Sequence, residues 1–131
     1  ASDLFTLYAT DGGMTAKVLI TPLIERLLNN KKTVITDLPS SGKVTLYRKG
    51  NGLTLHLVYA NTVVRGGGNT SVEVIEDIIT ISCVNVSLKA EKPVKVVLRP
   101  DGKELPFIYE NGTVNFSLKD FNCYAAIEFI Y

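Results

Sequence analysis

The chain has 131 residues, 46% of them hydrophobic, and its 14 basic and 13 acidic residues leave a formal net charge of +1. This is about the length of one domain, with enough apolar residues for one compact core. The balanced charge excludes an electrostatic nucleic-acid binder, and no apolar run approaches the ~18 residues of a membrane span. We therefore expect neither a nucleic-acid partner nor a membrane partner.

The segment 15–30 predicts a helix, because its apolar residues recur at roughly helical spacing. Thr21-Pro22 inside it is either an N-cap followed by a proline in the first turn, or a kink within one longer helix. Asn29-Asn30 and the lysines after them are typical of a helix C-terminus. Because an apolar stripe needs a partner surface, we expect the chain to expose an apolar patch. The patch is built either from one sheet face or from the stripe Val18, Leu23 and Leu27.

Residues 43–60 predict a β-hairpin. Apolar and polar residues alternate on both sides of Gly50-Asn51-Gly52, a sequence that turns the chain. The return strand has Thr54, His56 and Val58 on one face and its core residues on the other. These core residues are Leu53, Leu55, Leu57 and Tyr59.

Short strands with the same alternation continue to the end of the chain. One is expected within 75–90, three within 93–118 and a last one at 123–131, with turn signals at Pro100-Asp101-Gly102 and Asn111-Gly112. Six to eight such strands predict a mainly β fold. We expect an antiparallel β-sandwich of the immunoglobulin-like or Greek-key type, preceded by an N-terminal α-helix.

The segment 61–74, which carries three consecutive glycines, has the least regular pattern of the chain. Glycines permit backbone conformations that other residues resist, so the segment is interpreted as a flexible surface loop, with a ligand-binding loop as the alternative. It lacks the Lys-Ser/Thr ending of a phosphate-binding P-loop, and no helix pattern follows it.

The two cysteines, Cys83 and Cys123, are too few for a disulfide framework and lack the spacing of a zinc site. They are interpreted as buried free thiols, or as one bridge if their strands are neighbours. The sequence predicts no metal and no cofactor.

No catalytic constellation is found in the sequence. His56, the only histidine, lies between two leucines, and no motif provides a partner that orients it. Glu73, Glu76 and Asp77 form an acidic cluster. Glycosidase carboxylates flank a bond at ~5–9.5 Å, and residues this close along a strand or loop seldom do so. The sequence therefore predicts no catalytic residue.

A carbohydrate-binding surface is the alternative to a purely structural role. Tyrosine rings can stack on sugars, although the chain has no tryptophan, the largest such ring. Tyr59 shares the core face of its strand, which leaves other tyrosines for this purpose. Under this alternative, Tyr47 and Tyr109 are the candidate sugar-contacting residues.

Several motifs follow one another in an order that covers nearly the whole chain. Tyr8 with Gly12-Gly13 precedes the helix, Leu38-Pro39-Ser40-Ser41 follows it, and the strand sequence LHLVYAN comes next. VEVIEDIITISCVNVSL, PVKVVLRPDGKELPF and GTVNFSLKDFNCYAAIEFIY complete the order. The order resembles the C-terminal region of bacterial β-galactosidase-like glycoside hydrolases, where an amidotransferase-like (trimerisation-type) domain is followed by a terminal β-sandwich. The resemblance implies that residues 1–33 are a helical lead-in from the preceding domain and that residues 34–131 are the C-terminal β-sandwich domain.

The resemblance also implies a function. In such enzymes the catalytic carboxylates belong to an N-terminal (β/α)₈ barrel that this chain does not contain, so no site residue carries over. The implied role is a non-catalytic accessory domain that serves stability, inter-domain packing or oligomer assembly. The implied partners are the catalytic domain of the same parent chain and other copies in a homo-oligomer. The implied location is the bacterial cytoplasm. The N-terminus lacks the pattern of a signal peptide. The chain also lacks an initiator Met, which indicates either a processed chain or, as we expect, a fragment of a longer protein.

Overall fold

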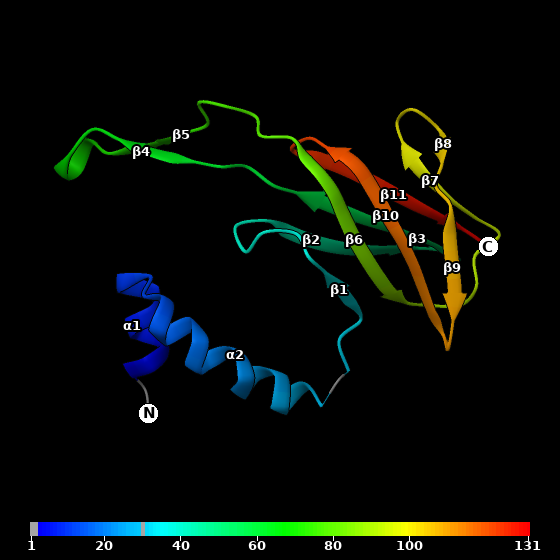
Figure 1. Cartoon of the computed structure of the whole chain (residues 1–131), viewed down its shortest axis with the longest axis horizontal. Helices are drawn as coiled ribbons and strands as arrows, with labels where there is room; N and C mark the ends of the chain where they lie inside the picture. The colour runs from blue at the N-terminus through cyan, green and yellow to red at the C-terminus, as the bar shows by residue number, and fades with distance from the viewer. Residues whose placement is uncertain (1–2, 30) are drawn as a thin grey trace. The chain divides into compact units, whose positions relative to one another are not determined.

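The computed structural model describes residues 3–29 and 31–131. The chain divides into two compact units, Ala1–Lys32 and Thr33–Tyr131. The first unit is helical where described, and the second is built of strands (Figure 1). Neither described helix combines the length and apolarity that crossing a bilayer requires.

The helical unit contains two helices, α1 (Asp3–Asp11) and α2 (Met14–Leu28), where the sequence predicted one. Gly12 separates them: its N–H donates to the carbonyl of Tyr8 at 3.0 Å, and its φ of 61° lies in the left-handed region that favours glycine. α1 was missed because its apolar residues, Leu4, Phe5, Leu7 and Tyr8, span little more than one helical turn.

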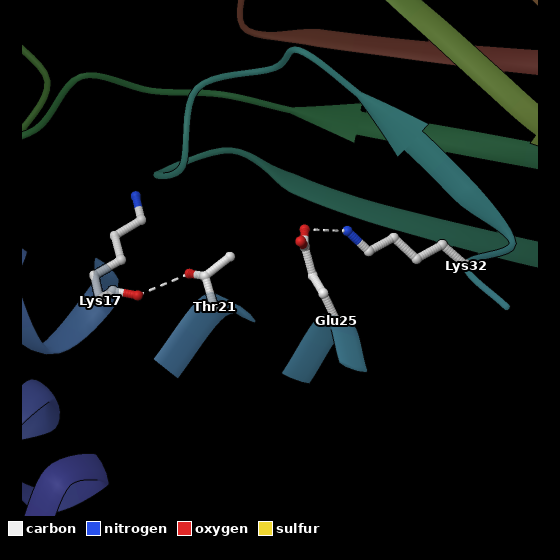
Figure 2. Close-up of polar contacts among 4 residues, drawn as sticks. All are labelled: Lys17, Thr21, Glu25 and Lys32. Carbon is white, nitrogen blue, oxygen red and sulfur yellow. Dashed lines mark hydrogen bonds and ion pairs between the residues drawn. The ribbon is translucent and has the colours of Figure 1, made fainter. Parts of the chain in front are cut away.

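Pro22 lies inside α2. The interpretation of Thr21-Pro22 as a helix start is therefore wrong, and that of one longer helix holds. Proline has no N–H to donate within the helix. On the residue before it, the Thr21 hydroxyl donates to the carbonyl of Lys17 at 2.8 Å, one turn back along the helix (Figure 2).

α2 ends at Leu28, close to the predicted helix C-terminus, and Asn29 caps it. Asn29 adopts the left-handed conformation (φ 44°), which Asn tolerates better than most residues, and its N–H bonds to the carbonyls of Glu25 and Arg26. The Lys32 ammonium lies 2.7 Å from the Glu25 carboxylate (Figure 2). This exposed ion pair connects the last turns of the helix to the segment that follows, and such pairs contribute about 0–1 kcal/mol.

The second unit is a sandwich of two antiparallel sheets (Figure 1). The four-stranded sheet has the order β1 (Val34–Thr36), β6 (Ile81–Lys89), β10 (Thr113–Phe121) and β9 (Phe107–Glu110). The five-stranded sheet has the order β2 (Lys43–Lys49), β3 (Gly52–Val58), β11 (Tyr124–Ile130), β7 (Lys95–Arg99) and β8 (Lys103–Glu104). The predicted mainly β, antiparallel sandwich with a helical N-terminal segment is confirmed, with more strands than the six to eight expected.

A separate two-stranded hairpin stands away from the sandwich (Figure 1). It consists of β4 (Val63–Arg65) and β5 (Val72–Val74), with the 3₁₀ turn η1 (Gly68–Thr70) between them. The sequence predicted an irregular loop here, and the structure instead pairs Val63 with Val74 and Arg65 with Val72. Strands of three residues are too short for their alternation to stand out beside the glycines.

The core lies between the two sheets and follows the alternation of the strands. Leu53, Leu55 and Leu57 of β3 are 5%, 0% and 0% exposed, as predicted, and Tyr59 is partly buried against them. Phe129 of β11 is fully buried and packs edge-to-face on Phe116, with ring centroids 5.9 Å apart. The rest of the buried cluster is Val84, Val86, Leu88, Val96, Leu105, Val114, Leu118, Phe121, Ala125 and Ile127.

Both cysteines are free thiols, so the alternative of a bridge is wrong. Cys123 is half-buried, whereas Cys83 is exposed, because it alternates with Val84 on β6 and faces away from the core. The expectation of a buried thiol is therefore wrong for Cys83.

Replacing Phe129 tests the core. We expect Phe129→Ala to lower the free energy of unfolding by about 3–5 kcal/mol, because it leaves a cavity between the sheets. Denaturant unfolding measures this. The control is Ile108→Ala, at a side chain 62% exposed on β9, which we expect to change stability by no more than about 0.5 kcal/mol. Equal effects of the two changes would contradict the core assignment.

Candidate functional site

The outer face of the five-stranded sheet carries most of the exposed aromatic rings of the sandwich. The register places Thr45, His56 and Ala126 in one row across β2, β3 and β11. Tyr47 and Tyr124 lie in the neighbouring rows, diagonal to His56, which is within reach of aromatic side chains. Because alternate residues face the same side of a strand, these side chains all point away from the core.

Tyr47, His56 and Tyr124 form what we call the aromatic cluster. The Nδ1 atom of His56 lies 2.7 Å from the Tyr124 hydroxyl, and the two rings stack at an interplanar angle of 25°. Tyr47 meets the His56 ring edge-on, with centroids 5.4 Å apart. The two tyrosines are 59% and 52% exposed, so the cluster presents aromatic surface to solvent. His56 is hydrogen-bonded to a phenol and not to a carboxylate, which does not make an activated base.

Tyr109, the second tyrosine proposed from the sequence, does not lie on this surface. It is on β9 in the other sheet, opposite Val114, and packs partly buried against the core. Tyr47 and Tyr109 therefore cannot form one sugar platform. The alternation of Phe107, Ile108 and Tyr109 could have indicated this inward direction from the sequence. The sequence left Tyr124 among the tyrosines available for a sugar platform, but its contact with His56 could not be predicted, because 68 residues separate the two.

A hollow adjoins Tyr124 at the end of the sandwich where β11 begins. It has a volume of about 210 Å³ and is lined by residues of the segments 98–101 and 118–125. These segments are the end of β7 with its turn and the β10–β11 connection. We call this feature the Tyr124 hollow.

A second hollow, of about 310 Å³, lies at the opposite end of the strands and is lined by Arg48, Asn51, Leu53, Glu91 and Tyr131. Burial raises the pKa of Tyr131 above its usual 10.0, although 39% of the residue is exposed. The Arg48 guanidinium opposes this effect, because a cation stabilises the phenolate, and Glu91 adds to it.

The outer face of the four-stranded sheet carries a polar ladder. The Ser87 hydroxyl donates to the Asn115 side-chain oxygen at 2.6 Å, and the Ser117 hydroxyl donates to that of Asn85 at 2.7 Å. The Asn85 amide in turn donates to Asp37 at 2.7 Å. A groove of about 410 Å³ runs beside these residues. The ladder groups largely satisfy one another, so we interpret them as cross-strand stabilisation.

The acidic cluster at the hairpin does not form a catalytic pair. The Glu76 carboxylate accepts a hydrogen bond from Arg65 Nε at 2.7 Å, and Glu73 lies opposite Val64 in the ribbon. In the described parts of the chain, no three His, Cys, Asp or Glu side chains gather closely enough to hold a metal ion.

The fold and these sites define a β-sandwich module with a helical N-terminal segment and exposed aromatic and apolar surfaces. No protein-family model matches the chain, and no curated protein does. Among solved structures, the chain is similar to alpha-L-fucosidase isoenzyme 2 from Paenibacillus thiaminolyticus, at 32% identity and a TM-score of 0.88. The similarity covers 98% of this chain and 20% of that one. The chain thus corresponds to about a fifth of the length of that fucosidase, a glycoside hydrolase, and is similar to one part of it.

Tyr131 gives a spectroscopic test of the second hollow. We expect Arg48→Ala to raise the pKa of Tyr131 further, because the cation that favours the phenolate is removed. Alkaline absorbance titrations, each compared with the same protein carrying Tyr131→Phe, measure this pKa. Because the folded-state pKa is raised, the stability contributed by Tyr131 is complete below pH 10.0 and is lost as the pH rises through the folded-state pKa. A lower or unchanged pKa in Arg48→Ala would contradict the assignment.

Proposed function

We propose that the chain is a non-catalytic C-terminal accessory domain of a glycoside hydrolase, which stabilises the enzyme by inter-domain packing or helps to assemble its oligomer. One observation carries the proposal: the chain matches a fucosidase along 98% of its own length, while it accounts for only 20% of that enzyme. On this proposal, residues 1–33 are the lead-in from the preceding domain and residues 34–131 are the terminal sandwich. The active site belongs to a barrel elsewhere in the parent.

The chemistry of the described residues supports an accessory role. Glycoside hydrolysis typically uses two carboxyl groups that flank the scissile bond. Here the carboxylates of Glu76, Glu104 and Glu128 are each held in an exposed ion pair with a basic side chain. His56 is hydrogen-bonded to Tyr124 and, within the described residues, to no carboxylate. These groups stabilise strands and do not form an acid–base pair.

Uncovered apolar side chains support a role in packing. Within the helical unit, Val18, Leu23 and Leu27 are 63%, 52% and 85% exposed. In the β unit, Val64 and Val72 of the hairpin are 63% and 56% exposed. A two-stranded ribbon is marginally stable alone in water, so a hairpin of this kind is stabilised when another surface covers it. On this proposal, the covering surface belongs to the parent enzyme or to another copy of the chain.

The parent enzyme is either β-galactosidase-like, as the sequence resemblance implies, or fucosidase-like, as the structural similarity suggests. On the proposal, the residues that select between the two sugars lie in the barrel of the parent enzyme. We also propose a location in the bacterial cytoplasm, which the resemblance to bacterial β-galactosidase-like enzymes implies.

A carbohydrate-binding module is the second candidate function. The observation that favours it is the aromatic cluster, in which Tyr47 and Tyr124 expose ring surface on a flat sheet face. Flat aromatic surface with a polar hydroxyl suits a ligand that is apolar on one face and polar at its edge. Tyr109, which faces the core, does not contribute to such a surface.

The absence of activity in the chain alone tests the main proposal. We expect the 131-residue chain to hydrolyse neither aryl α-L-fucosides nor aryl β-D-galactosides. The same chain expressed with the coding sequence that precedes it in the genome is expected to hydrolyse one of them. Release of the aryl alcohol measures both. Hydrolysis by the 131-residue chain, or an upstream sequence that encodes no barrel, would refute the proposal.

Self-association tests the packing role. We expect the chain to form dimers or larger species through its apolar stripe, and Leu27→Asp to shift it toward the monomer, because a charge then enters the contact. Size-exclusion chromatography with light scattering gives the mass. Arg26→Gln changes the net charge by the same amount on the same turn and is expected to leave the mass unchanged. A wild-type chain that is strictly monomeric would count against an apolar patch that needs covering.

A further inference from the structure

The Tyr124 hollow combines apolar side chains with polar ones. Leu118, Phe121 and Ala125 line it and are only 3%, 4% and 5% exposed, so they form its apolar base. Exposed polar side chains complete the lining: Arg99, Asp101, Lys119, Asp120 and Asn122. Its volume of about 210 Å³ is below the ~300–1,000 Å³ of sites for drug-sized ligands, which limits an occupant to about one ring.

Several of these polar groups are available to a ligand. Within the described chain, the side chains of Asp101, Lys119 and Asp120 have no hydrogen-bonding or ion-pair partner. The side-chain oxygen of Asn122 accepts from Thr80 at 2.6 Å, which leaves the Asn122 amide N–H groups free to donate. The hollow therefore offers free acceptors and free donors around an apolar base.

Backbone hydrogen bonds fix the turn that carries these groups. Asp120 and Cys123 adopt left-handed conformations, with φ of 53° and 51°. The carbonyl of Cys123 accepts a hydrogen bond at 2.7 Å from the N–H of Tyr59, at the end of β3. The neighbouring ring of Tyr124 is held by His56. A site supported in this way loses little conformational entropy when a ligand binds.

We propose that the Tyr124 hollow binds the terminal, neutral monosaccharide of a glycan. The exposed ring of Tyr124 contacts the apolar face of the sugar, while Asp101 and Asp120 accept hydrogen bonds from its hydroxyls. This inference goes beyond the accessory role, because packing and assembly require no ligand. It also differs from a platform on the open sheet face, since Tyr47 does not line the hollow.

The charges of the hollow favour a neutral ligand. Arg99 is already paired with Glu128, at 2.7 Å, so the unpaired groups are two carboxylates and one ammonium. A sugar with its own carboxylate would meet a site with an excess of negative charge. Carboxylates form strong, charge-assisted hydrogen bonds with hydroxyl donors, and neutral sugars are rich in hydroxyls.

Amide chemical shifts of the 131-residue chain test the proposal directly. The probes are methyl α-L-fucoside and methyl β-D-galactoside, with glucuronic acid as the anionic comparison. We expect at least one neutral probe to give saturable shifts confined to residues 98–101 and 118–125. The Kd is expected on the order of 1 mM, because a ligand of about 12 non-hydrogen atoms gives modest affinity. Glucuronic acid is expected to bind more weakly.

Variants locate the binding. Tyr124→Ala and Asp120→Asn are each expected to weaken binding at least about fivefold, the loss that follows from one contact or charged hydrogen bond. Asn tolerates the left-handed conformation of position 120. The matched control is Tyr131→Ala, which removes an exposed tyrosine at the opposite end of β11 and is expected to leave the Kd within about twofold.

Saturable binding that the variants of the hollow weaken would support the proposal, and two other results would overturn it. The absence of saturable shifts with both neutral probes would overturn the proposal. So would binding that is lost in Tyr131→Ala but kept in Tyr124→Ala and Asp120→Asn. If Tyr124→Ala fails to fold, as judged from its amide spectrum, Asp120→Asn decides alone. None of these results depends on hydrolysis by the parent, so failure here leaves the accessory role standing.

Discussion

The antiparallel pairing of β11 with β3 determines both the core and the candidate site. In this register Leu55 faces Ile127 on the inner side, where both are fully buried. The same register places Tyr124 diagonal to His56 on the outer side. Because side chains alternate with a period of two, a slip of one residue would turn Ile127 outward and Tyr124 inward. The energy of apolar burial therefore fixes the geometry of the aromatic cluster.

On the outer face of the five-stranded sheet, two exposed ion pairs lie beside an apolar side chain that faces away from the main core. Val97 faces away from the main core and is nevertheless only 6% exposed. It lies opposite Glu104 on one side and Glu128 on the other, and these carboxylates pair with Lys95 and Arg99. Exposed ion pairs contribute about 0–1 kcal/mol each. The aliphatic stems of long charged side chains can cover neighbouring apolar residues, which agrees with the low exposure of Val97.

The proposed accessory and sugar-binding roles use different surfaces and are compatible. Packing uses the helical stripe around Leu27 and the β4–β5 hairpin, both rich in uncovered apolar side chains. Sugar binding uses the Tyr124 hollow, where polar groups surround a small apolar base. A domain with these two kinds of surface can be anchored to a large hydrolase and still contact the end of a glycan. Neither role requires an acid–base pair within the chain.

The sequence alone determined the features that depend on local alternation. These are the inward side chains of β3, the outward direction of His56, the turn at Gly50-Asn51-Gly52 and the mainly β class. Only the tertiary structure decided which strands are neighbours. It therefore decided that His56 meets Tyr124, that Tyr109 packs on the core and that the turns after β7 and β10 meet at one hollow. Alternation predicts which face of its own strand a residue occupies. Which residue lies opposite it on the next strand depends on the total apolar burial of strands that are far apart in the chain.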